Sequence, residues 1–185
     1  MTVTTRTAVA AMLEARSVAL VGASARPGSL GARMIAEMAR SASRPRTYLV
    51  NPRYAEINGA PCLPSLDEVP EPVDLALLAV PDAALEAQLG AAARTGVRSV
   101  VIFGNAYDPP GTEGLRDRLA AIARGTGMAV CGAGCMGFVN VSRGLRAIGY
   151  LEPDPLPAGD VDEPHAARAA HRHPRVPGDR RQPVP

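Results

Sequence analysis

A loop of small residues between an apolar run and an amphipathic segment carries the clearest chemical signal in this chain. The apolar run ends at Gly22, and the loop leads to Ser29, a residue type that favours the N-cap of a helix. The loop residues are Ala23, Ser24, Ala25, Arg26, Pro27 and Gly28. The first turn of a helix exposes unpaired N–H groups and a partial positive charge, and small residues let an anion approach them closely. The loop therefore predicts an anion site, most simply a phosphate site.

The glycine spacing does not match a standard phosphate-binding fingerprint. Gly22 and Gly28 are six residues apart, so the pattern GxGxxG is not met. No P-loop ending in Gly, Lys and Ser or Thr is present either. A strand-to-helix turn that binds no ligand is the alternative interpretation.

The end of the next expected strand indicates which phosphate-containing ligand is preferred. Asn51, Pro52 and Arg53 follow the apolar run 48–50. An NAD site usually has an acid here, about 20 residues after the glycine loop, to hold the ribose hydroxyls. The arginine instead favours a phosphate on the ribose, as in NADP or coenzyme A (CoA). The alternative is an arginine that is simply solvated.

Apolar runs and amphipathic segments alternate along the chain, and this predicts strands alternating with helices. The strands are expected over residues 18–21, 48–50, 74–80, 97–103 and 128–131. A first helix is expected over residues 5–15, with Val9, Met12 and Leu13 on one side, and later helices begin at Ser29, at Asp82 as a cap, and at Thr112. Residues 53–72 are expected to form a long structured loop in which Asn58-Gly59 can turn a hairpin.

This alternation predicts a five-stranded, doubly wound parallel sheet of the Rossmann-like α/β class over about residues 5–145. Ligands of such folds bind beyond the carboxyl ends of the strands. The loops that would meet at that edge begin at Gly22, Asn51, Val80, Phe103 and Gly132.

The C-terminal part differs in composition. Residues 146–160 are expected to be a linker toward a second domain outside this sequence. Residues 161–185 contain no Leu, Ile, Met, Phe or Tyr but many prolines and arginines, and this predicts a disordered tail. The abrupt change near residues 160–162 suggests a truncated or frame-shifted end.

Composition limits the classes of partner. The net charge is only +2, which implies no strong field toward nucleic acid or a membrane. The apolar runs are too short to span a membrane, and the N-terminus lacks a signal-peptide core, so a cytoplasmic location is expected. The three cysteines, Cys62, Cys131 and Cys135, lie in or beside apolar segments, which suits reduced thiols better than a disulfide framework or a metal site.

Four blocks together carry a family likeness. In order they are SVALVGASARPGSLG, YLVNPRYAEINGAPCLPSLDEVPEPVDLALLAVP, VRSVVIFGNAY and CGAGCMGFVN. Over about residues 10–160 they resemble the CoA-binding domain of the NDP-forming acyl-CoA synthetases, of the ADP-forming acetate–CoA ligase and succinyl-CoA synthetase alpha-subunit type. The order and spacing of the blocks are more specific than any one of them.

The resemblance implies that the ligand is CoA. Residues 24–27 would wrap its phosphates, Arg53 would take the position of the family's basic residue for the nucleotide phosphate, and residues 80–81 and 103–105 would line the path of adenine and pantetheine. For Val80 and Phe103 a core role is the alternative. The full set of expected contacts is Gly22, Ser24, Ala25, Arg26, Pro27, Gly28, Ser29, Asn51, Arg53, Val80, Pro81, Phe103, Gly104 and Asn105.

The chain also departs from the family pattern. The family often has Gly-Pro-Asn-Cys before Met-Gly, whereas residues 132–137 read GAGCMG, which removes a rigid turn and an amide. Residues 1–160 contain no histidine or lysine to activate Cys135, so a structural role is expected for it.

The absence of histidine from residues 1–160 limits the activity expected of this chain. The family passes a phosphoryl group through a histidine of a following domain and takes it from ATP in a grasp domain. No catalytic residue is therefore assigned, and the chain is expected to bind CoA as part of a ligase, without turnover alone, with the phosphohistidine and ATP sites on other domains or subunits. The alternatives are an NADP-binding Rossmann protein, either oxidoreductase or redox sensor, and an inactive fragment.

Overall fold

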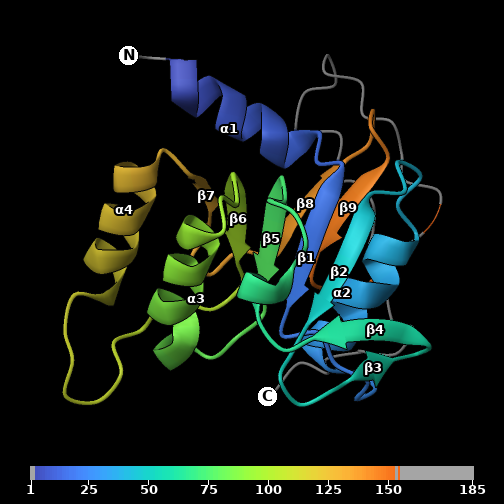
Figure 1. The fold of residues 1–185 in the computed structure, drawn as a ribbon, viewed down its shortest axis with the longest axis horizontal. Helices are drawn as coiled ribbons and strands as arrows, with labels where there is room; N and C mark the ends of the chain where they lie inside the picture. The colour runs from blue at the N-terminus through green and yellow to red at the C-terminus, as the bar shows by residue number, and fades with distance from the viewer. Residues whose placement is uncertain (1–2, 153, 155–185) are drawn as a thin grey trace, which may run out of the picture.

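Strands and helices alternate through most of the chain, as the apolar runs predict. The computed structural model describes residues 3–152 and residue 154, with side chains from residue 7 onward. Its elements are α1 (Val3–Leu13), β1 (Ser17–Val21), α2 (Leu30–Ala39), β2 (Arg46–Val50), β3 (Glu56–Ile57), β4 (Ala60–Leu63), the 3-10 turn η1 (Leu66–Glu68), β5 (Leu75–Leu78), α3 (Asp82–Arg94), β6 (Ser99–Ile102), α4 (Leu115–Thr126), β7 (Ala129–Cys131), β8 (Gly137–Asn140) and β9 (Leu145–Ile148) (Figure 1). The tail predicted to be disordered, 161–185, lies outside the described residues.

The main sheet confirms the α/β class and corrects the number of strands. Its order is β3-β4-β2-β1-β5-β6-β7, and every neighbouring pair is parallel except β3 with β4. The five expected strands are β2, β1, β5, β6 and β7. The expected count of five was wrong, because the segment after β2 turns back at Asn58-Gly59 and adds β4 and β3. The one proline in these two strands, Pro61 of β4, lies opposite Glu56 of the two-residue edge strand β3, and β2 pairs with β4 only at Cys62 and Leu63, so Pro61 interrupts no pairing with β2.

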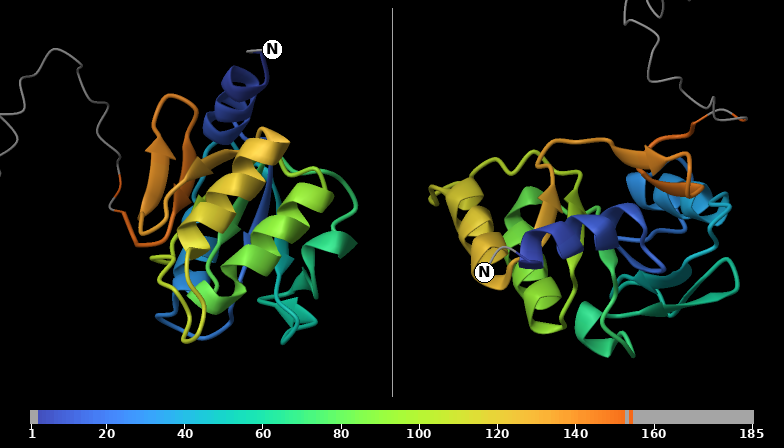
Figure 2. Two further views of the ribbon diagram at one scale, coloured as in Figure 1. Left: turned by 90° about the vertical axis from the view of Figure 1, so that its left-hand side faces the viewer. Right: turned by 90° about the horizontal axis from the view of Figure 1, so that it is seen from above.

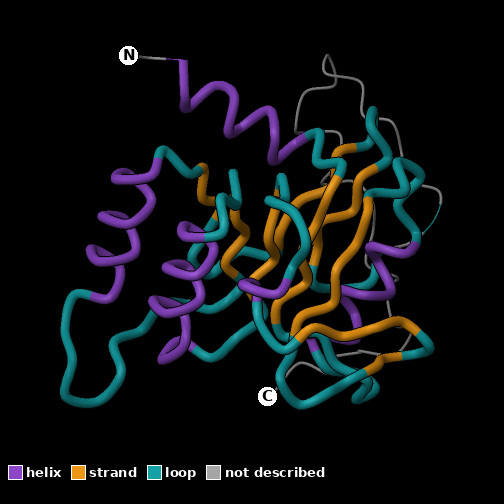
Figure 3. Tube along the Cα trace, viewed as in Figure 1, coloured by secondary structure: helices purple, strands orange, loops and turns teal. Residues whose placement is uncertain are grey.

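The strand register places three loops at one level. Val21, the last residue of β1, pairs with Val50 of β2 on one side and with Leu78 of β5 on the other. The loops after these strands therefore start side by side, at the lower edge of the sheet in Figure 3.

Helices cover both faces of the sheet. One face packs against α3, α4 and η1, and the other packs against α1, α2 and the two-stranded sheet β8–β9 (Figure 2). The side chains of β1 are buried on both faces, as expected for a central parallel strand. This arrangement leaves the carboxyl edge free for loops.

The buried side of α1 differs from the expectation. Ala8, Met12 and Ala15 are buried, whereas Val9 and Leu13 are 43% and 41% exposed. The helix packs near β6 and β7 through alanine side chains, which allow close approach. Of the three apolar residues expected on one side, only Met12 is buried, so Val9 and Leu13 were a poor guide to the buried face.

Two helix starts also differ. α3 begins at Asp82, but its cap position is Pro81, and the Asp82 carboxylate accepts hydrogen bonds from the backbone N–H groups of Ala106 and Tyr107 at 3.2 and 3.0 Å. α4 begins at Leu115 rather than Thr112, because the Asp108 carboxylate accepts from the Leu115 N–H at 2.7 Å. Asp82 thus holds the loop after β6, whereas Asp108 holds the first N–H group of α4.

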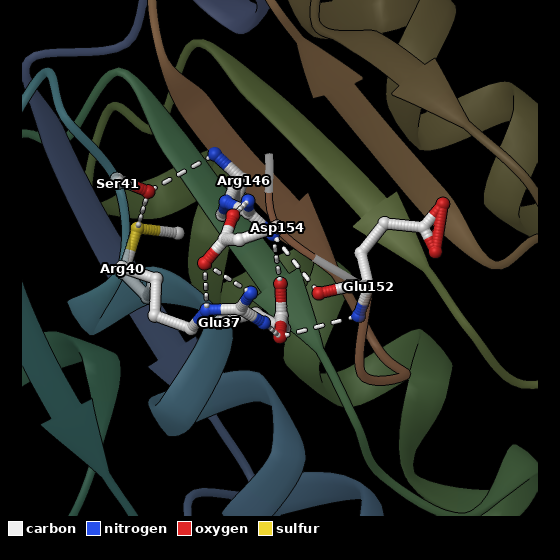
Figure 4. A network of polar contacts seen from close by, with 7 residues as sticks. Glu37, Arg40, Ser41, Arg146, Glu152 and Asp154 are labelled. Carbon is white, nitrogen blue, oxygen red and sulfur yellow. Dashed lines mark hydrogen bonds and ion pairs between the residues drawn. The ribbon is translucent and has the colours of Figure 1, made fainter. Parts of the chain in front are cut away.

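The hairpin β8–β9 was not expected. Residues 146–148, which the sequence assigns to a linker, form part of a buried strand that packs on α2. Arg146 interrupts the apolar run that would have predicted this buried strand. In the fold, buried Glu37 forms an ion pair with Arg146 (Figure 4).

Candidate functional site

The topology creates a crevice between the ends of β1 and β5. From β1 the chain crosses through α2 to β2 on one side, whereas from β5 it crosses through α3, on the opposite face, to β6 on the other side. Such a switch point is where open α/β sheets bind ligands. A cleft of about 580 Å³ lies there, within the usual range for small-molecule sites.

The loops after β1, β2 and β5 all contribute to this cleft. Eight residues expected from the sequence line it: Gly22, Ser24, Arg26, Ser29, Asn51, Arg53, Val80 and Pro81. Lining residues that were not among the expected contacts are Val21, Leu30, Gly31, Val50, Pro52, Tyr54, Pro64, Ala79, Ala84 and Gln88. None of the residues lining the cleft is acidic.

Six expected residues do not line the cleft. Ala25, Pro27 and Gly28 are exposed residues of the same loop. Phe103 packs into the core on the α2 face, next to Gly149. Gly104 accepts a backbone hydrogen bond from Gly134, and the exposed Asn105 accepts one from Arg116 through its carbonyl. The turn 103–105 thus joins the neighbouring loops.

Two glycines let the loop pass between β5 and α2. Gly22 has φ +87°, and a Cβ there would lie 2.2 Å from the Ala79 carbonyl oxygen. A Cβ on Gly31 would lie 2.2 Å from the Gly22 carbonyl oxygen. Gly31 therefore provides the close helix–strand packing that the third glycine of a dinucleotide fingerprint provides. The spacing Gly28-x-x-Gly31 was the available signal for it.

Ser29 is the N-cap of α2, as the sequence predicts. Its hydroxyl accepts from the Ala32 N–H at 3.1 Å and donates to the Arg26 carbonyl at 2.7 Å. The N–H groups of Leu30 and Gly31 stand at the start of the helix, where no intrahelical acceptor exists, and both residues line the cleft. These are donors for an anion.

Asn51 fastens the loop after β2 to the loop after β1. Its side-chain amide donates to the Ala23 carbonyl at 2.7 Å, and its Oδ1 accepts from the Arg53 N–H at 2.9 Å. Ser24 Oγ and Tyr54 OH form a second link at 3.4 Å. In the described part of the chain, the exposed side chains of Arg26 and Arg53 have no carboxylate partner, so both guanidinium groups are available to an anionic ligand.

Comparison with known families and proteins adds to this geometry. The model of a CoA binding domain family matches residues 16–141. The chain belongs to this family of CoA-binding domains. The domain is 35% identical over 147 residues to a trans-feruloyl-CoA synthase from an unknown prokaryotic organism, with 78% of this chain and 20% of the relative covered. It is 32% identical to the ADP-forming acetate–CoA ligase I of Archaeoglobus fulgidus, with 70% and 19% covered.

A solved structure of a CoA-using enzyme also contains a domain similar to this one. The CoA-binding domain superposes on the dinucleotide-forming acetyl-coenzyme A synthetase 1 of Ca. Korarchaeum cryptofilum, in complex with phosphate and ADP, with TM-score 0.65 and 27% identity, covering 72% of this chain and 29% of that chain. The chain thus spans about a fifth of the two curated relatives and under a third of the solved one.

Two further observations concern the described part of this CoA-binding domain. Its His, Cys, Asp and Glu side chains form no group of three that could hold a metal ion. None of its helices is long and apolar enough to cross a membrane.

Proposed function

We propose that the cleft between β1 and β5 binds the nucleotide end of CoA. The N-terminus of α2 and Arg26 receive the diphosphate, and Arg53 binds the phosphate on the ribose. The observation that carries this proposal is the pair of hydrogen bonds of Asn51: its amide joins the two arginine-bearing loops, and its Oδ1 holds the backbone of Arg53, at one cleft that has no acidic lining residue. A carboxylate at the same place would repel the ribose phosphate.

The rest of the cleft suits the less polar parts of CoA. Val80, Pro81 and Ala84 present apolar surface on the β5 side. Adenine and the pantetheine arm can pack on such surface, while the phosphates stay at the helix end. Phe103, Gly104 and Asn105, expected on the same path, remain proposed contacts for the pantetheine arm beyond this cleft.

We further propose that the chain is the CoA-binding part of an ADP-forming acyl-CoA ligase. The relatives are longer, and one of them, 33% identical, is the alpha subunit of the Pyrococcus furiosus acetate–CoA ligase II. The phosphohistidine and the ATP site then lie on other domains or subunits, and CoA serves as a substrate. A ligase of this kind works where free CoA is found, in the cytoplasm.

NADP is the competing ligand, because Arg53 could also hold a 2′-phosphate. Calorimetric titration and thermal unfolding with CoA, dephospho-CoA, NADP and NAD separate the two. A ligand at 100 times its dissociation constant stabilises the fold by roughly 2.7 kcal/mol. We expect CoA to bind about tenfold more tightly than dephospho-CoA, since one charge-assisted hydrogen bond contributes about 1.5 kcal/mol.

Two arginine variants test which side chain binds which phosphate of CoA. Arg53→Ala should remove the preference for CoA over dephospho-CoA, and Arg26→Ala should weaken both ligands. Arg124→Ala, an exposed arginine of α4 outside the cleft, is the matched control and should bind like the wild type. Stabilisation by NADP alone, or an unchanged CoA preference in Arg53→Ala, would contradict the proposal.

A further inference from the structure

The thiols of Cys131 and Cys135 lie next to each other. Their Sγ atoms are 3.9 Å apart, about 2 Å more than a disulfide bond length. Cys131 ends β7, and Cys135 lies in the turn that leads to β8. Both side chains are partly exposed, whereas Cys62 is buried at 6% exposure. Closing a disulfide requires the two sulfurs to approach each other by about this difference.

Each thiol of the pair has defined polar contacts. The Cys135 thiol lies 3.4 Å from the Ile102 carbonyl oxygen and 3.5 Å from the Cys131 carbonyl oxygen. The Cys131 thiol in turn donates toward the Cys135 sulfur. The contacts therefore order the pair, with Cys131 as the donor and the Cys135 sulfur as the acceptor.

The backbone of the turn is already held in place. Gly134 N–H donates to the Gly104 carbonyl at 2.7 Å, and the Met136 carbonyl accepts from Gly149 N–H at 3.1 Å. A Cβ on Gly132 would lie 2.4 Å from the Ile102 carbonyl oxygen, so the turn is pressed against the end of β6. The two thiols therefore stay close because the backbone between them has little room to move apart.

We propose that Cys131 and Cys135 form a reversible, redox-active thiol pair that closes to an intrachain disulfide with low-molecular-weight disulfides. The Cys135 thiolate attacks one sulfur of the small disulfide, so that a mixed disulfide forms and one small thiolate leaves. The Cys131 thiolate then attacks the Cys135 sulfur and expels the second small thiolate. The two protein thiols are oxidised to one disulfide, the small disulfide is reduced to two thiols, and the two protons pass to the released thiolates.

The closed form links the edge of the main sheet covalently to the start of the β8–β9 hairpin. Burial, and then the neighbouring Cys135, raise the pKa of the Cys131 thiol, so disulfide closure should speed up as the pH rises. In a reducing compartment such disulfides are transient and serve redox sensing. The pair lies outside the proposed CoA cleft, so the inference stands independently of the CoA site.

The test uses the full chain and oxidised glutathione as the probe. After exposure and removal of the probe, thiols are counted in denaturant, and the intact mass and peptide masses are measured. We expect the loss of two of the three thiols, a mass lower by two hydrogens, a linked Cys131–Cys135 peptide and free Cys62. Dithiothreitol should restore all three thiols.

Single substitutions distinguish the steps. Cys131→Ser should trap the glutathione adduct on Cys135, and the matched control Cys62→Ser should close the disulfide like the wild type. Circular dichroism of each variant verifies that it is folded. The proposal fails if the wild type keeps three free thiols, retains a stable glutathione adduct, or forms a disulfide that includes Cys62 or a second chain.

Discussion

Glu37 of α2 and Arg146 of β9 form an ion pair of 2.8 Å whose side chains are only 0% and 5% exposed. Arg40 also pairs with Glu37, and Asp154 pairs with both arginines, so four charged side chains from three segments meet (Figure 4). The C-terminal end of α2 is therefore fixed to the hairpin, while its N-terminal end lies in the proposed CoA cleft. The network positions the helix on which the site depends.

Removing one partner of this pair should strongly destabilise the fold. Glu37→Ala leaves the Arg146 charge buried without its interior partner, and we expect a loss of about 3–5 kcal/mol in the free energy of unfolding. The matched control is Glu86→Ala, which breaks the 2.8 Å pair with Arg118 on the surface and should cost about 1 kcal/mol or less. Urea unfolding measures both, and equal losses would contradict this view of the interior pair.

Asp154 should give the fold an acid-dependent contribution. Its hydrogen bond with Arg40, and then the charges of Arg146 and Arg40, lower the pKa of its carboxyl below the ordinary value. A carboxyl with a lowered pKa stabilises the folded state fully above the ordinary aspartate range, and the contribution is lost as the pH falls through the lowered pKa.

We therefore expect Asp154→Asn to melt below the wild type at pH 7. The difference should shrink as the pH falls below about 4, the ordinary aspartate range. Thermal unfolding of both proteins across this range is the measurement. A difference that stays constant down to the lowest pH would assign the effect to something other than the charge.

Two helical glycines should respond in opposite directions to alanine. In Gly31→Ala the new Cβ meets the Gly22 carbonyl oxygen at 2.2 Å, so the loop must move away from α2, and both stability and CoA affinity should fall. In Gly125→Ala of α4 nothing lies within 4 Å, and the variant should be more stable by about 0.8–1 kcal/mol. Thermal unfolding and CoA titration compare them, and a neutral Gly31→Ala would argue against the close approach.

Asn51 should act on CoA binding as well as on stability. Asn51→Ala removes both hydrogen bonds that hold the loops carrying Arg26 and Arg53, and we expect CoA affinity to fall about tenfold, equivalent to roughly 1.4 kcal/mol. Asn140 is the matched control, because its amide also donates to a backbone carbonyl, that of Leu13 at 2.8 Å, and its Oδ1 also accepts from the backbone, from Arg143 N–H at 3.2 Å. Asn140→Ala should lower stability but leave CoA affinity unchanged, as titration with CoA can show.

The sequence alone predicts the parts of this protein that depend on neighbours along the chain. Buried parallel strands such as β1 consist of continuous apolar residues, and the N-cap at Ser29 depends on its own hydroxyl and the next three residues. The alternation of such segments, together with the order of the four family blocks, was sufficient for the α/β class and for the CoA-binding family. These signals are local, so no tertiary contact is needed to recognise them.

Tertiary structure alone decides which side chains meet. It brings Arg26 and Arg53 to one cleft through Asn51, packs the partly buried Phe103 against the core on the α2 face, and buries Arg146 in a strand because Glu37 faces it. The distances between such residues are set by strand order and helix packing, which involve groups far apart along the chain. The structural role of a charged strand residue such as Arg146, or of a helical glycine such as Gly31, therefore depends on the group that folding places against it.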